Sequence, residues 1–190
     1  VHLPLIKGKA LAVIGVRRGG KTTFLWQCLK SRLIAGVSRE SQLMLLLEDD
    51  RLEGLTVQDL AWVIEEHRRA LPPLSEGQRI GLFLDEIQEV PGWEKLVRRL
   101  IDAGEHDVFI SGSSAKLLSR EVATSLRGRA MEVLVHPFSF REVCARAGTD
   151  DRFEQDRLLR DYLEVGGFPE SQGAELRDRV ALLRGYVDTI

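Results

Sequence analysis

The segment Gly15–Thr22 has the spacing GxxxxGK[ST] and lies between an apolar run and an amphipathic one. Glycines at this spacing let the backbone curl with its N–H groups pointing inward, and the start of a following helix adds the positive end of its dipole. A lysine and a hydroxyl at the end of such a loop hold the β- and γ-phosphates and a magnesium ion. The segment therefore predicts a loop that binds the phosphates of a nucleoside triphosphate.

Residue type suggests a role for each position of this loop. Lys21 is expected to reach the β- and γ-phosphates, and the Thr22 hydroxyl is expected to coordinate Mg²⁺. Because Lys21 is placed on the loop, its replacement by alanine is expected to cost the fold little. The other predicted nucleotide contacts are Gly15, Arg18, Gly19, Gly20 and Thr23.

Two carboxylates, Asp85 and Glu86, follow the apolar run Gly81–Leu84. Ligands of an open α/β sheet gather at the carboxyl ends of its strands. Hydrolysis needs one carboxylate for the magnesium shell and a second to orient and deprotonate the attacking water. Asp85 is the candidate for the first role and Glu86 for the second; the alternative is a strand with a solvated end.

Hydroxyl and guanidinium groups near later strand ends are further candidates. Ser113 or Ser111 could hydrogen-bond to the attacking water or the γ-phosphate, although Ser113 or Ser114 could instead cap the next helix. Arg127 and Arg129 precede the last apolar run, a position from which a guanidinium could reach a γ-phosphate in the same or a neighbouring subunit. The alternative for either arginine is a solvated surface position.

The elements that must position these groups alternate between apolar and amphipathic runs. Predicted strands are Ala10–Gly15, Gln42–Leu47, Arg79–Leu84, Asp107–Ser111 and Ala130–Val135. Predicted helices are Thr22–Ile34, Leu60–Leu71, Trp93–Ala103 and Ala115–Leu126. This order predicts an α/β fold of three layers, the P-loop NTPase type, with a five-stranded, mainly parallel sheet. Three tryptophans, Trp26, Trp62 and Trp93, fall on separate helices at positions suited to packing.

The strand pattern stops after Val135. Helical patterns follow at Ser139–Ala147, Phe153–Val165 and Glu175–Tyr186. The predicted division is a sheet domain of residues 1–136 and a small helical subdomain of residues 137–190, too short for a robust core of its own. The last helical pattern has no stop signal, so we expect the chain to be truncated at its C-terminus.

Composition excludes several classes of protein. The 190 residues include 27 Lys and Arg against 29 Asp and Glu, a formal net charge of −2 that gives no indication of nucleic-acid binding. No apolar run approaches the roughly 20 residues of a membrane-spanning helix, and no signal peptide opens the chain. The two cysteines show neither disulfide nor zinc spacing. We expect a cytoplasmic protein.

These motifs together resemble the AAA-type P-loop ATPases, and more narrowly a prokaryotic family of predicted AAA ATPases that are normally fused to a C-terminal domain of unknown function. Besides Gly15–Thr22, the features that carry the resemblance are Asp85–Gln88 with Pro91 and Trp93, Ser111–Ser114, Gly128-Arg129, Pro137–Phe140 with Glu142, and Gly166–Pro169. The resemblance covers the ATPase portion and implies that residues 1–136 are the AAA-type core and residues 137–190 the lid over the nucleotide. It also implies that Pro169 contacts the base, although a turn that ends a helix is the alternative.

The expected function is Mg²⁺-dependent binding and hydrolysis of ATP, with ADP as product, coupled to an attached or partner effector. The alternative is a slow nucleotide-dependent switch with little intrinsic turnover. A homo-oligomer and a missing C-terminal effector domain are the expected partners. The charge balance offers no basic groove for a third class, a DNA-binding module.

Overall fold

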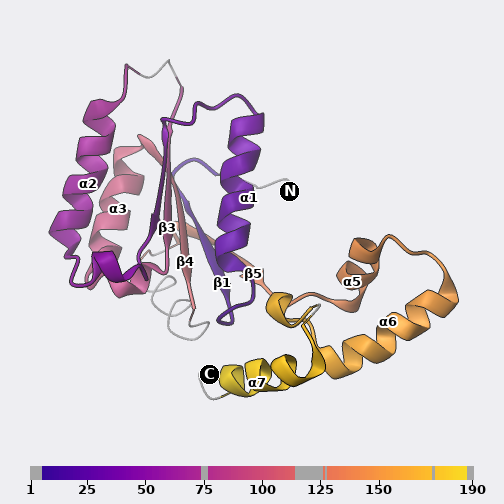
Figure 1. Cartoon of the computed structure of the whole chain (residues 1–190). Coiled ribbons are helices and arrows are strands. Elements are labelled where there is room, and N and C mark those ends of the chain that lie inside the picture. Colours follow the sequence, from indigo (N-terminus) through magenta and orange to yellow (C-terminus); the bar gives the residue numbers. More distant parts are fainter. Residues whose placement is uncertain (1–5, 74–76, 114–125, 127, 173, 188–190) are drawn as a thin grey trace. The chain divides into compact units, whose positions relative to one another are not determined.

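The computed structural model describes residues 6–73, 77–113, 126, 128–172 and 174–187 (Figure 1). The chain forms two compact units. The first comprises Val1–Ile14 and Lys21–Leu134, and the second comprises Gly15–Gly20 and Val135–Ile190. The predicted helix Ala115–Leu126 lies almost wholly outside the described residues.

A five-stranded parallel sheet forms the centre of the first unit, with strand order β2-β3-β4-β1-β5. The strands are β1 (Ala10–Gly15), β2 (Gln42–Leu46), β3 (Ile80–Asp85), β4 (His106–Gly112) and β5 (Ala130–Val135). Helix α1 (Lys21–Ile34) covers one face, and α2 (Val57–Ala70) and α3 (Trp93–Ala103) cover the other (Figure 1). The predicted α/β fold of three layers is confirmed.

Alternation along the central strands divides the core between the two faces. Leu82, Leu84 and Ile110 belong to the cluster that packs against α2 and α3. Phe83 and Phe109 alternate with them, and their rings stack with centroids 4.3 Å apart. Because both faces of β3 and β4 are buried, their central segments, Leu82–Leu84 and Val108–Ile110, are continuously apolar rather than alternating.

The expectation that all three tryptophans pack in the core is wrong for two of them. Trp93 is 2% exposed, whereas Trp26 is 43% and Trp62 is 64% exposed. Trp62 stands two positions after the buried Leu60, about 200° around the helix, and therefore lies on the outer face of α2. A tryptophan on an amphipathic helix is not by itself a core signal.

In the described part of the second unit, three helices follow β5. They are α5 (Phe140–Ala147), α6 (Arg152–Val165) and α7 (Leu176–Val187), with the short 3₁₀ helix η3 (Pro169–Ser171) before α7. The Tyr162 hydroxyl donates to the Phe138 carbonyl over 2.8 Å. A Cβ on Gly167 would stand 2.2 Å from the same carbonyl oxygen, so only glycine fits where these two segments meet.

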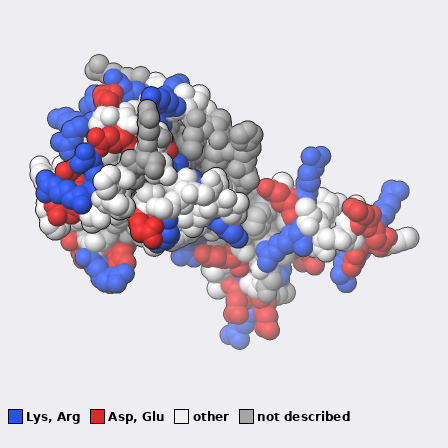
Figure 2. Space-filling view, turned by 90° about the horizontal axis from the view of Figure 1, so that it is seen from above, with Lys and Arg blue, Asp and Glu red and all other residues white. Residues whose placement is uncertain are grey.

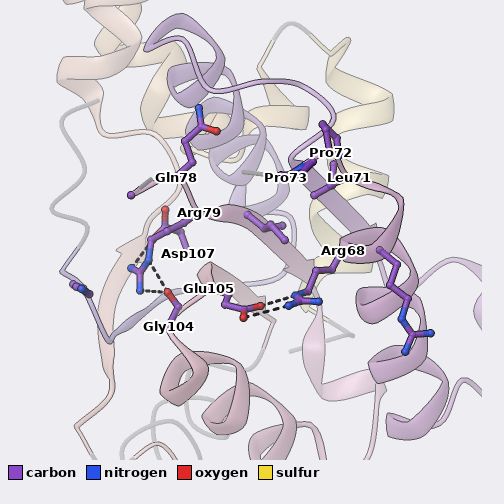
Figure 3. A pocket seen from close by; sticks show the side chains of 13 residues that line it. Arg68, Leu71, Pro72, Pro73, Gln78, Arg79, Gly104, Glu105 and Asp107 are labelled. Atoms are coloured by element: carbon purple, nitrogen blue, oxygen red, sulfur yellow. Dashed lines mark hydrogen bonds and ion pairs between the residues drawn. The ribbon is translucent and has the colours of Figure 1, made fainter. Parts of the chain in front are cut away.

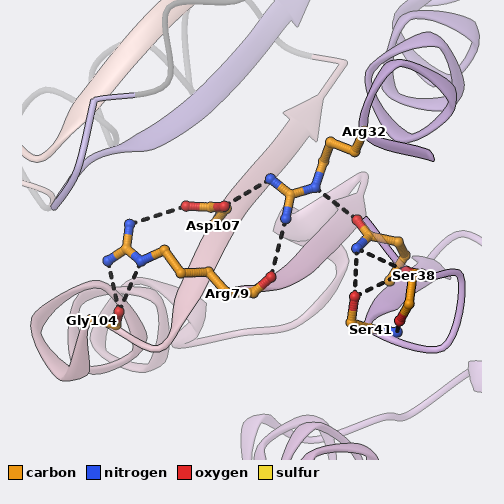
Figure 4. A network of polar contacts seen from close by, with 7 residues as sticks. Arg32, Ser38, Ser41, Arg79, Gly104 and Asp107 are labelled. Carbon is orange, nitrogen blue, oxygen red and sulfur yellow. Dashed lines mark hydrogen bonds and ion pairs between the residues drawn. The ribbon is translucent and has the colours of Figure 1, made fainter. Parts of the chain in front are cut away.

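A mostly buried ionic network lies at the amino ends of β3 and β4 (Figure 4). Asp107 accepts from Arg32 of α1 over 2.7 Å through one oxygen and from Arg79 over 3.0 Å through the other. Arg32 also donates to Gln42 of β2, and Arg79 donates to the Gly104 carbonyl. The network therefore ties α1 to β2, β3 and β4.

We predict that Asp107→Asn lowers the free energy of unfolding by roughly 3 kcal/mol, because Arg32 and Arg79 would lose a shared counter-ion in a mostly buried position. Urea unfolding measures the change. The matched control is Asp102→Asn, which removes an exposed partner of Arg129 and should cost less than about 1 kcal/mol. Equal losses in the two variants would contradict a structural role for the network.

Candidate active site

The carboxyl ends of β3 and β4 and the start of α1 meet at Asp85 in the first unit. The Thr22 hydroxyl donates to Asp85 Oδ2 over 2.7 Å, and the Ser111 hydroxyl donates to Asp85 Oδ1. Ser111 also accepts from the backbone N–H of Glu86 over 3.0 Å. The structure thus brings together the two residues predicted to hold magnesium and adds Ser111 as their support.

Glu86 forms the second part of this cluster. Its Oε1 lies 3.2 Å from Lys21 Nζ, in an ion pair whose side chains are 8% and 3% exposed. The Glu86 backbone is left-handed, with φ 53° and ψ 54°, a conformation that costs a non-glycine residue of order 1–2 kcal/mol. The hydrogen bond from its N–H to Ser111 helps to hold this conformation.

The placement of Lys21 corrects one expectation. Lys21 is the first residue of α1 and is buried, not part of an exposed loop. Its removal leaves the Glu86 carboxylate buried without this counter-ion. A measurable cost to stability is therefore expected for Lys21→Ala.

Asp85 and Thr22 together fit a magnesium ion. Carboxylate and hydroxyl oxygens are hard ligands, and Mg²⁺ is commonly held by one or two protein groups with phosphates and water completing the shell. Burial raises the pKa of Asp85, while the hydrogen bonds from Ser111 and Thr22 favour its charged form and the neighbouring Glu86 disfavours it. A cation at this position would offset the cost of burying that charge.

Within the second unit, two glycines of the loop Gly15–Gly20 are constrained, one by close packing and one by its backbone conformation. A Cβ on Gly15 would stand 2.3 Å from the Val135 carbonyl oxygen, and Gly20 has a φ of 104°. Both positions therefore require glycine. A Cβ built on Gly20 would stand 4.0 Å from Pro169 Cγ, which places the predicted base-contacting residue next to this loop.

Arg18 links the loop to α7 inside the second unit. Its guanidinium lies 4.8 Å from the centre of the Tyr186 ring and 3.3 Å from Glu170 Oε2. The Tyr186 hydroxyl in turn donates to Glu170. The side chain of Arg18 is therefore engaged by two residues that follow the predicted lid turn.

The family model for the AAA domain matches residues 7–144 of the chain. The chain belongs to the AAA domain family. Membership indicates a nucleotide-binding function of the ATPase type.

Uncharacterized protein MJ1544 of Methanocaldococcus jannaschii is 37% identical over all of this chain and 42% of its own length. An uncharacterized protein of Haemophilus influenzae is 34% identical over 94% of the chain and 44% of its own length. The chain thus spans about two fifths of these relatives.

The remaining predicted site residues of this AAA domain differ in their surroundings, and one lies outside the described residues. Ser111 contacts Asp85, whereas Ser113 follows the end of β4. Arg129 forms a 3.0 Å ion pair with Asp102 of α3. Thr23 is exposed on α1, and Arg127 lies outside the described residues. The expectations for Ser113, Thr23 and the two arginines stay predictions.

A hollow of about 850 Å³ lies at the amino ends of β3 and β4, away from Asp85 and Glu86 (Figure 3). Arg68 donates to Glu105 over 2.6 Å, and Arg79 is held by Gly104 and Asp107. Its arginines are thus engaged by neighbouring groups of the AAA domain. The residues that line the hollow include none of the predicted site residues.

Basic and acidic side chains are interspersed on the face shown in Figure 2. This distribution agrees with the net charge of −2. Across the described part of the AAA domain, no helix combines the length and apolar character needed to cross a membrane.

We predict that Asp85→Asn raises the thermal midpoint of the nucleotide-free protein at neutral pH by a few °C at most, the scale on which small stability changes move the midpoint of a domain of this size. The reason is that burial raises the pKa of Asp85 above its ordinary 3.8, so its charge opposes folding. This gain should shrink as the pH falls through the raised pKa and vanish below pH 3.8, where the carboxyl is protonated in both the folded and the unfolded protein. The same variant should lose the Mg²⁺ dependence of ATP binding. Asp102→Asn, at an exposed carboxylate, is the control. A midpoint of Asp85→Asn below that of the wild type would contradict the claim that the charge of Asp85 opposes folding.

Proposed function

We propose that this AAA domain binds Mg·ATP and hydrolyses it to ADP and phosphate. The observation that carries the proposal is the convergence of Lys21 and Thr22 on Glu86 and Asp85 in the first unit. In this proposal the loop Gly15–Gly20 and Lys21 hold the phosphates, with Arg18 and Thr23 contributing. Pro169 contacts the base.

Thr22 and Asp85 would hold the magnesium ion, which neutralises charge on the phosphates when bound. The 2.7 Å hydrogen bond between these side chains keeps both oxygens at one place before the ion arrives. Ser111 fixes the other oxygen of Asp85, so the carboxylate does not rotate freely. The protein therefore supplies a preorganised pair of ligands.

Glu86 is the proposed general base. It takes a proton from a water whose oxygen attacks the γ-phosphorus, while the bond from that phosphorus to the β–γ bridging oxygen breaks and leaves ADP. Lys21, released from Glu86 by the more highly charged triphosphate, stabilises the phosphates. The ion pair of the nucleotide-free protein supports this exchange because it holds the two groups 3.2 Å apart, within reach of each other.

A slow nucleotide switch is the second candidate, and the contacts of Arg18 favour it. Arg18 belongs to the phosphate-binding loop, yet it is engaged by Glu170 and the ring of Tyr186 on α7. A triphosphate that competes for this guanidinium would change how the loop is held to α7. Nucleotide state would then be passed to residues 137–190, acting as a lid, and to an attached or partner effector.

We predict that Glu86→Gln binds Mg·ATP within a few-fold of wild type but releases phosphate at least about 100-fold more slowly, because a positioned base contributes a factor of 10²–10⁴ to the rate.

Lys21→Ala should weaken ATP binding at least tenfold. The double variant Lys21→Ala/Glu86→Gln removes both charges of the buried pair, so it separates loss of phosphate binding from loss of stability. ATP affinity retained in both lysine variants would contradict the loop assignment.

Phosphate release measured across protein concentrations distinguishes the two candidates. Specific activity that rises with concentration would indicate a homo-oligomer in which Arg127 or Arg129 of a neighbouring copy completes the site. Activity independent of concentration would place that arginine in the same subunit. Intact Mg·ATP binding without phosphate release would establish the switch and contradict hydrolysis.

A further inference from the structure

The two carboxylate oxygens of Glu86 are held by different donors. Lys21 Nζ contacts Oε1 at 3.2 Å, and Gln88 Nε2 donates to Oε2 over 2.7 Å. Lys21 carries a charge that a triphosphate would attract, whereas the Gln88 amide is neutral. The contacts of Lys21 and of Gln88 with Glu86 therefore respond differently to a bound nucleotide.

The backbone of Gln88 is held in place by the residues that precede and follow it. It belongs to the 3₁₀ helix η2 (Ile87–Glu89), which begins directly after Glu86. Ile87 is fully buried in the core shared by α2 and α3, and the Val90 N–H donates to its carbonyl over 3.1 Å. A rigid turn thus carries the amide that contacts Glu86.

The orientation of the Gln88 amide is also determined. Its NH₂ group lies 2.7 Å from Glu86 Oε2 and 3.5 Å from Glu89 Oε1, so two carboxylates face the nitrogen. The carbonyl oxygen is buried and has no hydrogen-bond partner among the described residues. Burying an acceptor without a partner lowers stability, a cost that an apolar side chain of similar size would avoid. A glutamine at this position therefore lowers stability but supplies a hydrogen-bond donor to Glu86.

We propose that Gln88 is the positioning residue for Glu86, holding Oε2 so that Oε1 is presented to the attacking water once Lys21 has turned to the triphosphate. This inference rests on the proposed function. Without the Gln88 contact, the carboxylate would regain side-chain freedom and would be repelled by the phosphates. With the Gln88 contact in place, Oε1, the oxygen that Lys21 has left, accepts the proton of the water.

The test compares Gln88→Ala with the control Gln27→Ala, which truncates an exposed glutamine of α1. We expect Gln88→Ala to lower kcat about tenfold or more, with KM and the Kd for Mg·ATP within about twofold of wild type. Gln27→Ala should leave all three unchanged. A purely structural role of Gln88 would instead lower the thermal midpoint and weaken ATP binding together with kcat.

A double-mutant cycle with Glu86→Gln supplies the second readout. Because Gln88 acts through Glu86, adding Gln88→Ala to Glu86→Gln should leave the residual single-turnover rate unchanged within about twofold. The same tenfold loss in both backgrounds would overturn the inference, as would wild-type kcat in Gln88→Ala. In either case wild-type turnover would still support the proposed function. Absence of turnover in the wild type would overturn both, and it is seen before any variant is compared.

Discussion

The buried ion pair between Lys21 and Glu86 is the interaction on which the arrangement of the site depends. Lys21 begins α1 and Glu86 follows β3, so the pair joins two elements at the carboxyl end of the parallel sheet. Both charges are removed from water, and each is tolerable because the other is present. Thr22, the residue after Lys21, and Asp85, the residue before Glu86, join the same two elements by a hydrogen bond.

The rest of the first unit holds this link in register. Parallel pairing places Leu84 of β3 opposite Ile110 of β4, and Ser111 follows Ile110 at the level of Asp85 and Glu86. At the other ends of the same strands, Asp107 binds Arg32 of α1 and Arg79. Helix α1 is thus attached to the sheet by charged groups at both ends of β3 and β4, with stacked phenylalanines between them.

Much of the fold could be predicted from the sequence because its elements have strong local patterns. Strand Ala130–Val135 and helix Trp93–Ala103 have the predicted bounds. Helix α2 begins at Val57 rather than Leu60, because Thr56 and Asp59 form a capping box in polar residues that precede the apolar stripe. The expectation for Trp26 and Trp62 is wrong because a position on a helix does not by itself place a tryptophan on the buried face.

The sequence by itself determined the chemistry of the candidate site: the loop spacing, the two carboxylates and the strand ends that carry them. The tertiary structure decided which groups meet. It placed the Ser111 hydroxyl on Asp85, paired Arg129 with Asp102 and placed the Gln88 amide on Glu86. The physical reason is that residue type and local spacing specify what a side chain can do. Its partner depends on strand register, on burial and on the left-handed backbone of Glu86, which no local pattern encodes.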